Sequence, residues 1–264
     1  MKKHKGKFSE ESKNKKVDQS AIDAQTKNAK QGMRLNKYIA NSGKCSRRDA
    51  DLFIKSGNVQ VNGKVVTEMG HRVNLDDEVI FDGQRIDPAP KEYVILNKPK
   101  GFFVTGNPNK HGRTVMDIVN KFTKSQLAPV GKLDNSATGL MLFTNDGTLS
   151  KKLASSKSQL KQLFDVNLNK PMQYDDLKML QNEKTFIGGK QVVINSIDYV
   201  KSKPKRNIGI EIISTEDHIV PKIMKKMGYE VEKLDRVKYG EITKKDLARG
   251  MCRHLTKQEV INLG

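Results

Sequence analysis

Residues 34–66 read RLNKYIANSGKCSRRDADLFIKSGNVQVNGKVV, and this stretch decides the fold of the first third of the chain. Leu35, Tyr38 and Ile39 have the i, i+3, i+4 spacing of one face of a helix. The sequence Ser46-Arg47-Arg48-Asp49 matches a capping box, which marks the start of a second helix because the serine hydroxyl can accept a free backbone N–H. The stretch therefore begins with two short helices.

The rest of this stretch has the signals of a helix end followed by a small antiparallel sheet. Gly57 is a typical helix stop. Asn62-Gly63 separates two valine-rich runs, which is the strongest short-range signal of a two-residue hairpin. A further apolar run at residues 79–81 adds a strand. The pattern predicts a compact unit of two helices and a small sheet over residues 33–87.

The segments on either side of this unit differ from it in composition. Residues 1–32 contain nine Lys and four acids with few bulky apolar residues, which predicts a disordered basic tail that aids solubility or, as we favour, contacts phosphate. Pro88-Ala89-Pro90 indicates a linker. Residues 91–264 hold short apolar runs that do not alternate regularly with helices, so we expect an α+β domain with a mostly antiparallel mixed sheet. Helices are predicted near residues 148–155, 174–182 and 217–227.

Composition limits the partners of the protein. The 264 residues include 49 Lys+Arg and 30 Asp+Glu, a formal charge of +19, which favours a nucleic acid over a membrane surface. Cys45 and Cys252 form no CxxC pair, so neither a disulfide framework nor a zinc site is predicted. No apolar run is long enough to span a bilayer, and no hydrophobic stretch follows the Lys-rich N-terminus. We expect a cytoplasmic protein.

Basic residues gather around the predicted start of the second helix. No acid lies between the first and the last of them, whereas an ordinary solvated face would intersperse acids among the cations. The free N–H groups and the dipole at a helix start also favour phosphate. Contacts with an RNA backbone are therefore predicted for Arg34, Lys37, Lys44, Arg47 and Arg48, which would position the protein but read little sequence.

Three further motifs follow in order: LNKPKG at 96–101, VGKLDNSATGLMLFTNDG at 130–147 and KLDRVKYGEITKKDLARGMCRHLT at 233–256. Together with the first unit, they resemble the S4-domain pseudouridine synthases (RsuA-like enzymes), which isomerise uridines of small- and large-subunit ribosomal RNA. The resemblance covers about residues 33–256. It implies an S4 RNA-binding domain before a pseudouridine synthase domain, no metal and no cofactor. The implied partner is ribosomal RNA or a ribosomal assembly intermediate, and the chain shows no oligomerisation signature, so a monomer is expected.

The resemblance assigns the catalytic carboxylate to Asp134. Isomerisation breaks the N1–C1′ bond, turns the uracil and joins C5 to C1′ without a redox change, so one positioned carboxylate suffices once the uridine is extruded from its stack. On the Leu-Asp pair alone, a turn carboxylate is the simpler interpretation, which the surrounding motif reverses. Lys98 and Lys100 are predicted to contact phosphate, with an ordinary charged turn as the alternative. Residues 145–147 are interpreted as a structural turn.

Several positions near the expected site depart from the family pattern. Lys132 stands where the family has arginine before the Leu-Asp pair, which keeps the charge but loses the bidentate fork. Asn135 and Ala137 replace a basic residue and a threonine. Phe164 replaces the active-site tyrosine and keeps the ring, while Gln162 replaces a lysine.

The family's arginine-rich run aligns with residues 215–223. Glu216, His218 and Pro221 stand at arginine positions there, and Lys222 is the surviving cation. Because a nearby positive charge keeps a carboxylate ionised, we expect Lys132 or Lys222 beside Asp134 in an active enzyme. We also expect Glu216 to point to solvent and Phe164 to lie against the uracil pocket.

Two hypotheses follow from these departures. In the first, the protein is an active pseudouridine synthase in which a lysine replaces the lost arginine. In the second, it is a catalytically impaired paralogue that still binds ribosomal RNA as an assembly or structural factor. A third, a standalone S4 RNA-binding module, is disfavoured by the large second region.

Overall fold

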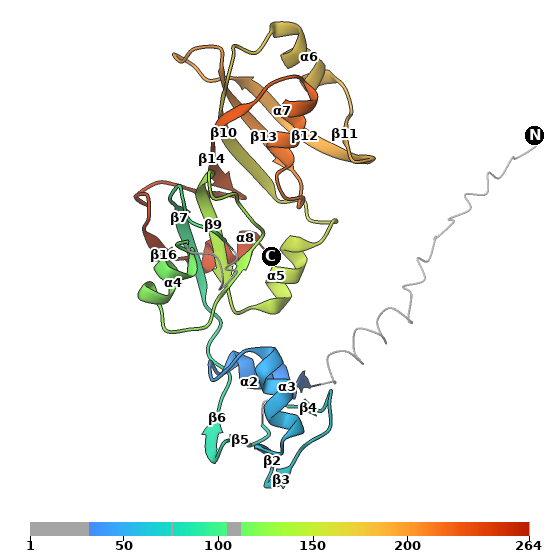
Figure 1. Cartoon of the computed structure of the whole chain (residues 1–264), viewed down its shortest axis with the longest axis vertical. Helices are drawn as coiled ribbons and strands as arrows, with labels where there is room; N and C mark the ends of the chain where they lie inside the picture. Colours follow the sequence, from blue (N-terminus) through green and yellow to red (C-terminus); the bar gives the residue numbers. More distant parts are fainter. Residues whose placement is uncertain (1–31, 75, 105–111, 264) are drawn as a thin grey trace, which may run out of the picture. The chain divides into compact units, whose positions relative to one another are not determined.

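The computed structural model of the chain describes residues 32–74, 76–104 and 112–263. The chain divides into two compact units, Met1–Pro88 and Ala89–Gly264 (Figure 1). The predicted basic tail lies, apart from Gly32, outside the described residues. Within the described ranges, no helix is both long and apolar enough to cross a membrane.

The first unit is built from two helices and two small sheets. Its four-stranded antiparallel sheet has the order β3-β2-β5-β6, and β1 pairs separately with β4. The elements are β1 (Met33–Arg34), α2 (Leu35–Asn41), α3 (Arg47–Lys55), β2 (Val59–Val61), β3 (Lys64–Val65), β4 (Arg72–Val73), β5 (Val79–Phe81) and β6 (Gln84–Ile86).

The helices of this unit form as their sequence predicts. Leu35, Tyr38 and Ile39 are all at least 99% buried, so the predicted apolar face of α2 is the face that packs into the core. The Ser46 hydroxyl accepts the backbone N–H of Asp49 at 3.2 Å and caps α3. The predicted cap is therefore confirmed, and it satisfies one of the donors that a helix start leaves free.

The hairpin of the first unit is also confirmed. Asn62 and Gly63 both have positive φ, 50° and 74°, as a tight turn between two twisted strands requires. Val61 then pairs with Lys64 across the turn. The strands β1 and β4 were not predicted, because two residues are too few to show a period.

The second unit is a mixed sheet with helices on both faces. The main strand order is β11-β12-β13-β10-β14-β9-β7-β16, with β8 paired to β9 and β15 paired to β14. Only β14 and β9 run parallel among the pairs of this sheet in the described residues, which confirms the predicted α+β class with a largely antiparallel sheet.

The bounds of the elements of the second unit are as follows: β7 (Tyr93–Lys98), α4 (Met116–Phe122), β8 (Ala128–Val130), β9 (Thr138–Thr144), α5 (Gly147–Ala154), β10 (Lys161–Leu168), α6 (Tyr174–Asn182), β11 (Thr185–Ile187), β12 (Lys190–Tyr199), β13 (Asn207–Ile213), α7 (Ile219–Lys226), β14 (Val231–Tyr239), β15 (Ile242–Thr243), β16 (Cys252–His254) and α8 (Lys257–Leu263). The helices predicted near 148–155, 174–182 and 217–227 form as α5, α6 and α7. The helices α4 and α8 were not predicted.

The central strand β9 is buried on both faces. Met141 and Phe143 belong to a core that includes residues of α4, α6 and α7, whereas Leu140 and Leu142 belong to a second core with α5 and α8. Successive side chains of a strand point to opposite faces, so a strand covered by helices on both sides needs a continuous apolar run. This arrangement explains the LMLF sequence and fixes the loop that precedes β9.

Candidate active site

The loop 131–137, between β8 and β9, holds Asp134 in place through its backbone. The Asp134 carbonyl accepts a hydrogen bond from Lys98 Nζ at 2.7 Å and another from the Ala137 N–H at 3.2 Å. Gly101 N–H donates to the Asn135 carbonyl at 2.6 Å. The loop is therefore tied to the end of β7, and the Asp134 side chain keeps 28% of its surface exposed.

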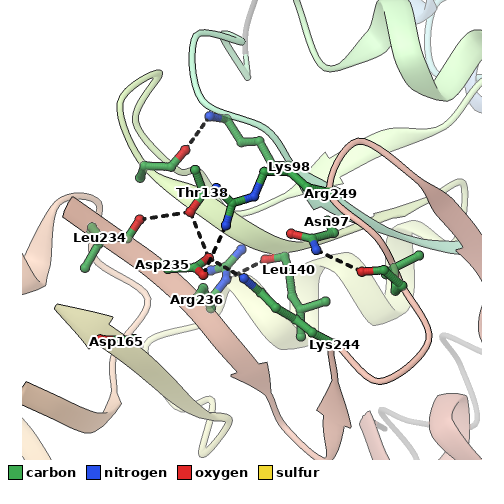
Figure 2. A network of polar contacts seen from close by, with 12 residues as sticks. Asn97, Lys98, Thr138, Leu140, Asp165, Leu234, Asp235, Arg236, Lys244 and Arg249 are labelled. Carbon is green, nitrogen blue, oxygen red and sulfur yellow. Dashed lines mark hydrogen bonds and ion pairs between the residues drawn. The ribbon is translucent and has the colours of Figure 1, made fainter. Parts of the chain in front are cut away.

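Lys98 is the tether of this loop and not a phosphate contact. Its side chain is fully buried, and Nζ donates to the carbonyls of Asp134 and Ala137, both at 2.7 Å. Figure 2 shows Lys98 on β7, with a dashed hydrogen bond at its ammonium group. Burial lowers the pKa of Lys98 to about 8. The predicted phosphate contact of Lys98 is wrong, because its ammonium cannot reach RNA; Lys100, two residues on, is exposed.

His218 is the side chain that pairs with Asp134. Its Nδ1 lies 2.6 Å from Asp134 Oδ1 and 2.7 Å from Oδ2. His218 precedes α7 as its N-cap in the left-handed conformation, with φ 59° and ψ 26°. Such a conformation is uncommon for a residue other than glycine, and it occurs preferentially at functional sites. An imidazole is able to carry a positive charge, so His218 occupies the place beside Asp134 that a missing arginine could fill.

The two lysines predicted beside Asp134 have other environments. Lys132 Nζ pairs with Asp217 at 3.2 Å. Lys222 is exposed on α7, because Val220 and Ile223 occupy the buried face of that helix. The prediction that Lys132 or Lys222 partners Asp134 is therefore wrong.

Glu216 takes an intermediate position. Its side chain, 31% exposed, lines the cavity beside Asp134, but its carboxylate pairs with Lys190 Nζ at 3.0 Å. The expectation that Glu216 points freely to solvent is thus wrong in detail. The Lys190 pair neutralises its charge, so that Glu216 opposes the ionisation of Asp134 less than an unpaired carboxylate would.

Asp134 lies between two cavities. The first, which we call the Asp134 cavity, measures about 40 Å³ and is lined by Phe164, His218, Pro221 and Arg236 among others. The second measures about 350 Å³ and also contains Asp134 and Pro221. The first has room for about one water, so that a base can enter beside Phe164 only when it widens. Phe164 is 96% buried there; its stacking on uracil stays a prediction.

Arg236 forms a buried wall of the Asp134 cavity that the sequence analysis missed. Its Nε donates to the Leu140 carbonyl at 2.7 Å and its Nη1 to Gln162 Oε1 at 2.8 Å, while Gln162 Nε2 donates to the Ser214 carbonyl at 2.8 Å. Burial lowers the pKa of Arg236 to about 10. The signal for it in the closing motif was no more than an arginine between Asp235 and Val237. Gln162 thus joins Arg236 to the segment that precedes α7.

The Asp235 carboxylate on β14 connects β14 to β9, the parallel pair of strands in this sheet. Asp235 accepts a hydrogen bond from the Thr138 hydroxyl of β9 at 2.8 Å and forms ion pairs with Lys244 and Arg249 (Figure 2). Asn97 Nδ2 of β7 donates to the Leu247 carbonyl at 2.9 Å. The closing motif is therefore fixed to β9, which follows the Asp134 loop, and to β7, to whose end the loop is tied.

The predicted RNA-binding residues of the first unit lie at the start of α3 and near the start of α2. Arg47 Nη2 donates to Asn36 Oδ1 at 3.4 Å and brings the start of α3 beside the first turn of α2. Arg34, Lys44, Arg47 and Arg48 are exposed and Lys37 is partly exposed. Lys44 Nζ also donates to Gln84 Oε1 at 3.0 Å.

In the ranges 32–74, 76–104 and 112–263, no three His, Cys, Asp or Glu side chains group in a way that could hold a metal ion.

Comparisons with known proteins agree with this geometry. A sequence model of the RNA pseudouridylate synthase family matches residues 92–226, and one of the S4 domain matches residues 33–79. The chain is 32% identical over 234 residues to ribosomal large subunit pseudouridine synthase B of Bacillus subtilis, which covers 87% of this chain and 95% of that protein.

Two further comparisons point the same way. The chain is 31% identical to the dual-specificity RNA pseudouridine synthase RluF of Escherichia coli over 88% of this chain and 78% of that one. A solved structure, described as the crystal structure of pseudouridylate synthase, superposes with a TM-score of 0.59 and 25% identity, covering 88% of this chain and all of the other. The chain therefore belongs to the RNA pseudouridylate synthase family and has an S4 domain before the synthase region.

Proposed function

We propose that this protein isomerises a specific uridine of ribosomal RNA to pseudouridine, as a cytoplasmic monomer, with Asp134 as its catalytic residue. The single observation that carries the proposal is the contact between Asp134 and His218, 2.6 Å between Oδ1 and Nδ1. This contact supports the proposal because it gives Asp134 a partner able to carry positive charge where the segment before α7 lacks arginines. Membership in the family and the ribosomal substrate named for the Bacillus subtilis relative support the proposal.

In this proposal, each residue of the site has a separate task. Cleavage of the N1–C1′ bond leaves its electron pair on the base; the base turns, C5 bonds to C1′, and the proton lost from C5 is balanced by one gained at N1. Asp134 acts on the ribose or the base in its ionised form, which His218 stabilises and orients. Phe164 offers a ring face for stacking, and Lys98 positions the loop without touching the substrate.

RNA recognition is divided between the two parts of the chain. We assign residues 33–87 to the S4 RNA-binding domain and residues 91–264 to the catalytic domain, with the tail 1–32 adding salt-dependent attraction. The exposed cations at the start of α3 would hold the RNA backbone, while the Asp134 cavity would take the extruded uridine. Lys100, exposed next to the Asp134 loop, would add a phosphate contact.

The test is a pseudouridine map of ribosomal RNA from cells with and without the gene. We expect at least one pseudouridine to disappear when the gene is deleted and to return on complementation with the wild type. Identical maps would reject the proposal and favour a protein that binds ribosomal RNA without modifying it.

A further inference from the structure

A cavity separate from Asp134 lies where the C-terminal end of α5, the segment 155–160 and α8 meet. We call it the α5 cavity; it measures about 500 Å³, a size typical of ligand sites. Among the described residues, its lining contains Lys152 and Lys157 and no carboxylate side chain. The Asp134 cavity, in contrast, is lined by both signs of charge. Of these two cavities, the α5 cavity is therefore the one whose charged lining side chains are all cationic.

The hydroxyl groups in this cavity are arranged as donors. Ser155 Oγ accepts the Lys157 N–H at 3.2 Å, and Ser158 Oγ accepts the Leu160 N–H at 3.4 Å. Each hydroxyl thus has a lone pair engaged by the backbone and its own proton available to an acceptor. Lys152 and Lys157 enter no ion pair in the part of the chain that the structure describes. Two ammonium groups and two hydroxyls suit an anion with several oxygens, such as a phosphate.

Helix electrostatics explain only part of this cluster. Lysines in the last turn of a helix are favoured by its dipole, which accounts for Lys151 and Lys152 without any ligand. Lys157 lies beyond the helix end, however, and still lines the cavity. Lys151, adjacent in sequence, does not line it, because it projects from another side of α5. The cluster is therefore more than a helix C-terminus.

The α5 cavity is connected to the site of reaction. It shares Leu153, Ser158 and Leu160 with a small bridging cavity. The bridging cavity in turn shares Gln162 and Arg236, among others, with the Asp134 cavity. A chain of shared lining residues thus links the α5 cavity to the Asp134 cavity.

We propose that the α5 cavity binds a backbone phosphate of the RNA strand that flanks the target uridine. The inference rests on the proposed function for the identity of the strand, since an extruded uridine leaves its neighbouring nucleotides outside the Asp134 cavity, where a nearby cationic site can hold them. Phosphate contacts position a nucleic acid and do not read its sequence. Lys152 and Lys157 therefore set how the strand is held, and Asp134 acts on the base that the strand presents.

The experiment measures the salt dependence of binding for a 5′-labelled, unstructured 20-nucleotide oligoribonucleotide that contains uridine. The full-length variant K152Q/K157Q is compared with the wild type and with K151Q/K184Q, which removes two exposed lysines that line none of the cavities found. Because each neutralised phosphate on a single strand contributes about 0.7 to the log–log slope, loss of the one phosphate held by the cavity in K152Q/K157Q should lower the slope by about 0.7, and K151Q/K184Q should lower it by much less.

The possible outcomes distinguish a failure of the proposed phosphate site from a failure of the proposed function. An equal loss of slope in both variants would show general surface charge and overturn the site, as would no loss in either. Titration with inorganic phosphate distinguishes a free anion: if phosphate binds the cavity but the RNA slope of K152Q/K157Q is unchanged, the RNA assignment is wrong. The assay needs no turnover, so it reads the same in D134N and stays informative if the protein forms no pseudouridine.

Discussion

His218 Nδ1 lies 2.6 Å from Asp134 Oδ1, although 84 residues separate the two in sequence. The contact depends on the left-handed backbone of His218, which turns its ring from the start of α7 toward the Asp134 loop. In the family pattern, the same segment carries arginines. The protein therefore places a histidine beside Asp134 from the segment where the family has arginines.

Replacing His218 should slow modification without unfolding the protein. Hydrogen bonds to charged groups contribute about 1.5–3 kcal/mol, so H218A should lower the single-turnover rate of pseudouridine formation by about 10- to 100-fold. H218R keeps a permanent charge and should retain most of the rate. H218N tolerates the left-handed backbone and keeps a donor but no charge, and it should resemble H218A. An unchanged rate in H218A would show that His218 has no part in the reaction.

Replacing Lys98 should loosen the Asp134 loop. In K98M the Asp134 carbonyl keeps only the Ala137 N–H and the Ala137 carbonyl loses its Lys98 donor, and an unsatisfied buried group costs about 1–3 kcal/mol. A fall in Tm of several degrees is expected for a chain of this size, together with a loss of turnover and an unchanged Kd for RNA. K100M, which changes an exposed lysine two residues away, should leave Tm unaltered. Equal Tm values for the two variants would contradict the tether.

The pH dependence of activity should also reflect Lys98. Burial lowers the pKa of Lys98 from 10.5 to about 8. Between pH 8 and pH 10.5 this lysine therefore binds more protons in the unfolded chain than in the folded one. Its contribution to the free energy of unfolding rises with pH over that range. Its hydrogen bonds to the loop weaken over the same window, because the neutral amine has one proton fewer. Turnover should therefore fall above pH 8 while Tm shows no loss from this group. A rate that stays flat to pH 10 would contradict this role.

The salt dependence of RNA binding should report on the first unit. Replacing Arg34, Lys37, Arg47 and Arg48 together by Ala should lower the log–log slope of affinity against salt by about 3, at about 0.7–0.9 per phosphate contact. K55A/K64A, which removes two exposed cations elsewhere in the same unit, is the control and should change the slope little. A wild-type slope in the fourfold variant would show that a different face of the protein binds the RNA.

Local signals made much of the fold predictable. The Ser46 cap and the Asn62-Gly63 turn depend on residues a few positions apart, and the structure forms both. The buried strand at the LMLF run could be predicted from one rule, that a strand covered on both faces is apolar throughout. The short elements β1, β4 and β15 escaped prediction because two residues show no period.

The partners in the site were harder to predict, because they depend on distant segments. Lys222 was chosen from its position in the motif, but α7 turns it to solvent. Lys98 was interpreted as a surface cation, since nothing in LNKPKG shows that its ammonium fits beneath a loop 36 residues away. Asp134 itself was assignable from its motif, whereas the pairing with His218 required the backbone conformation before α7.

The most direct test of the account uses purified protein and the ribosomal RNA of cells that lack it. Pseudouridine is quantified after incubation with the wild type or with D134N, which keeps the shape of the side chain and removes its charge. The account predicts stoichiometric pseudouridine at a defined site with the wild type, none with D134N, and similar RNA affinity for both. Pseudouridine formed at that site by D134N, or none formed by the wild type, would contradict it.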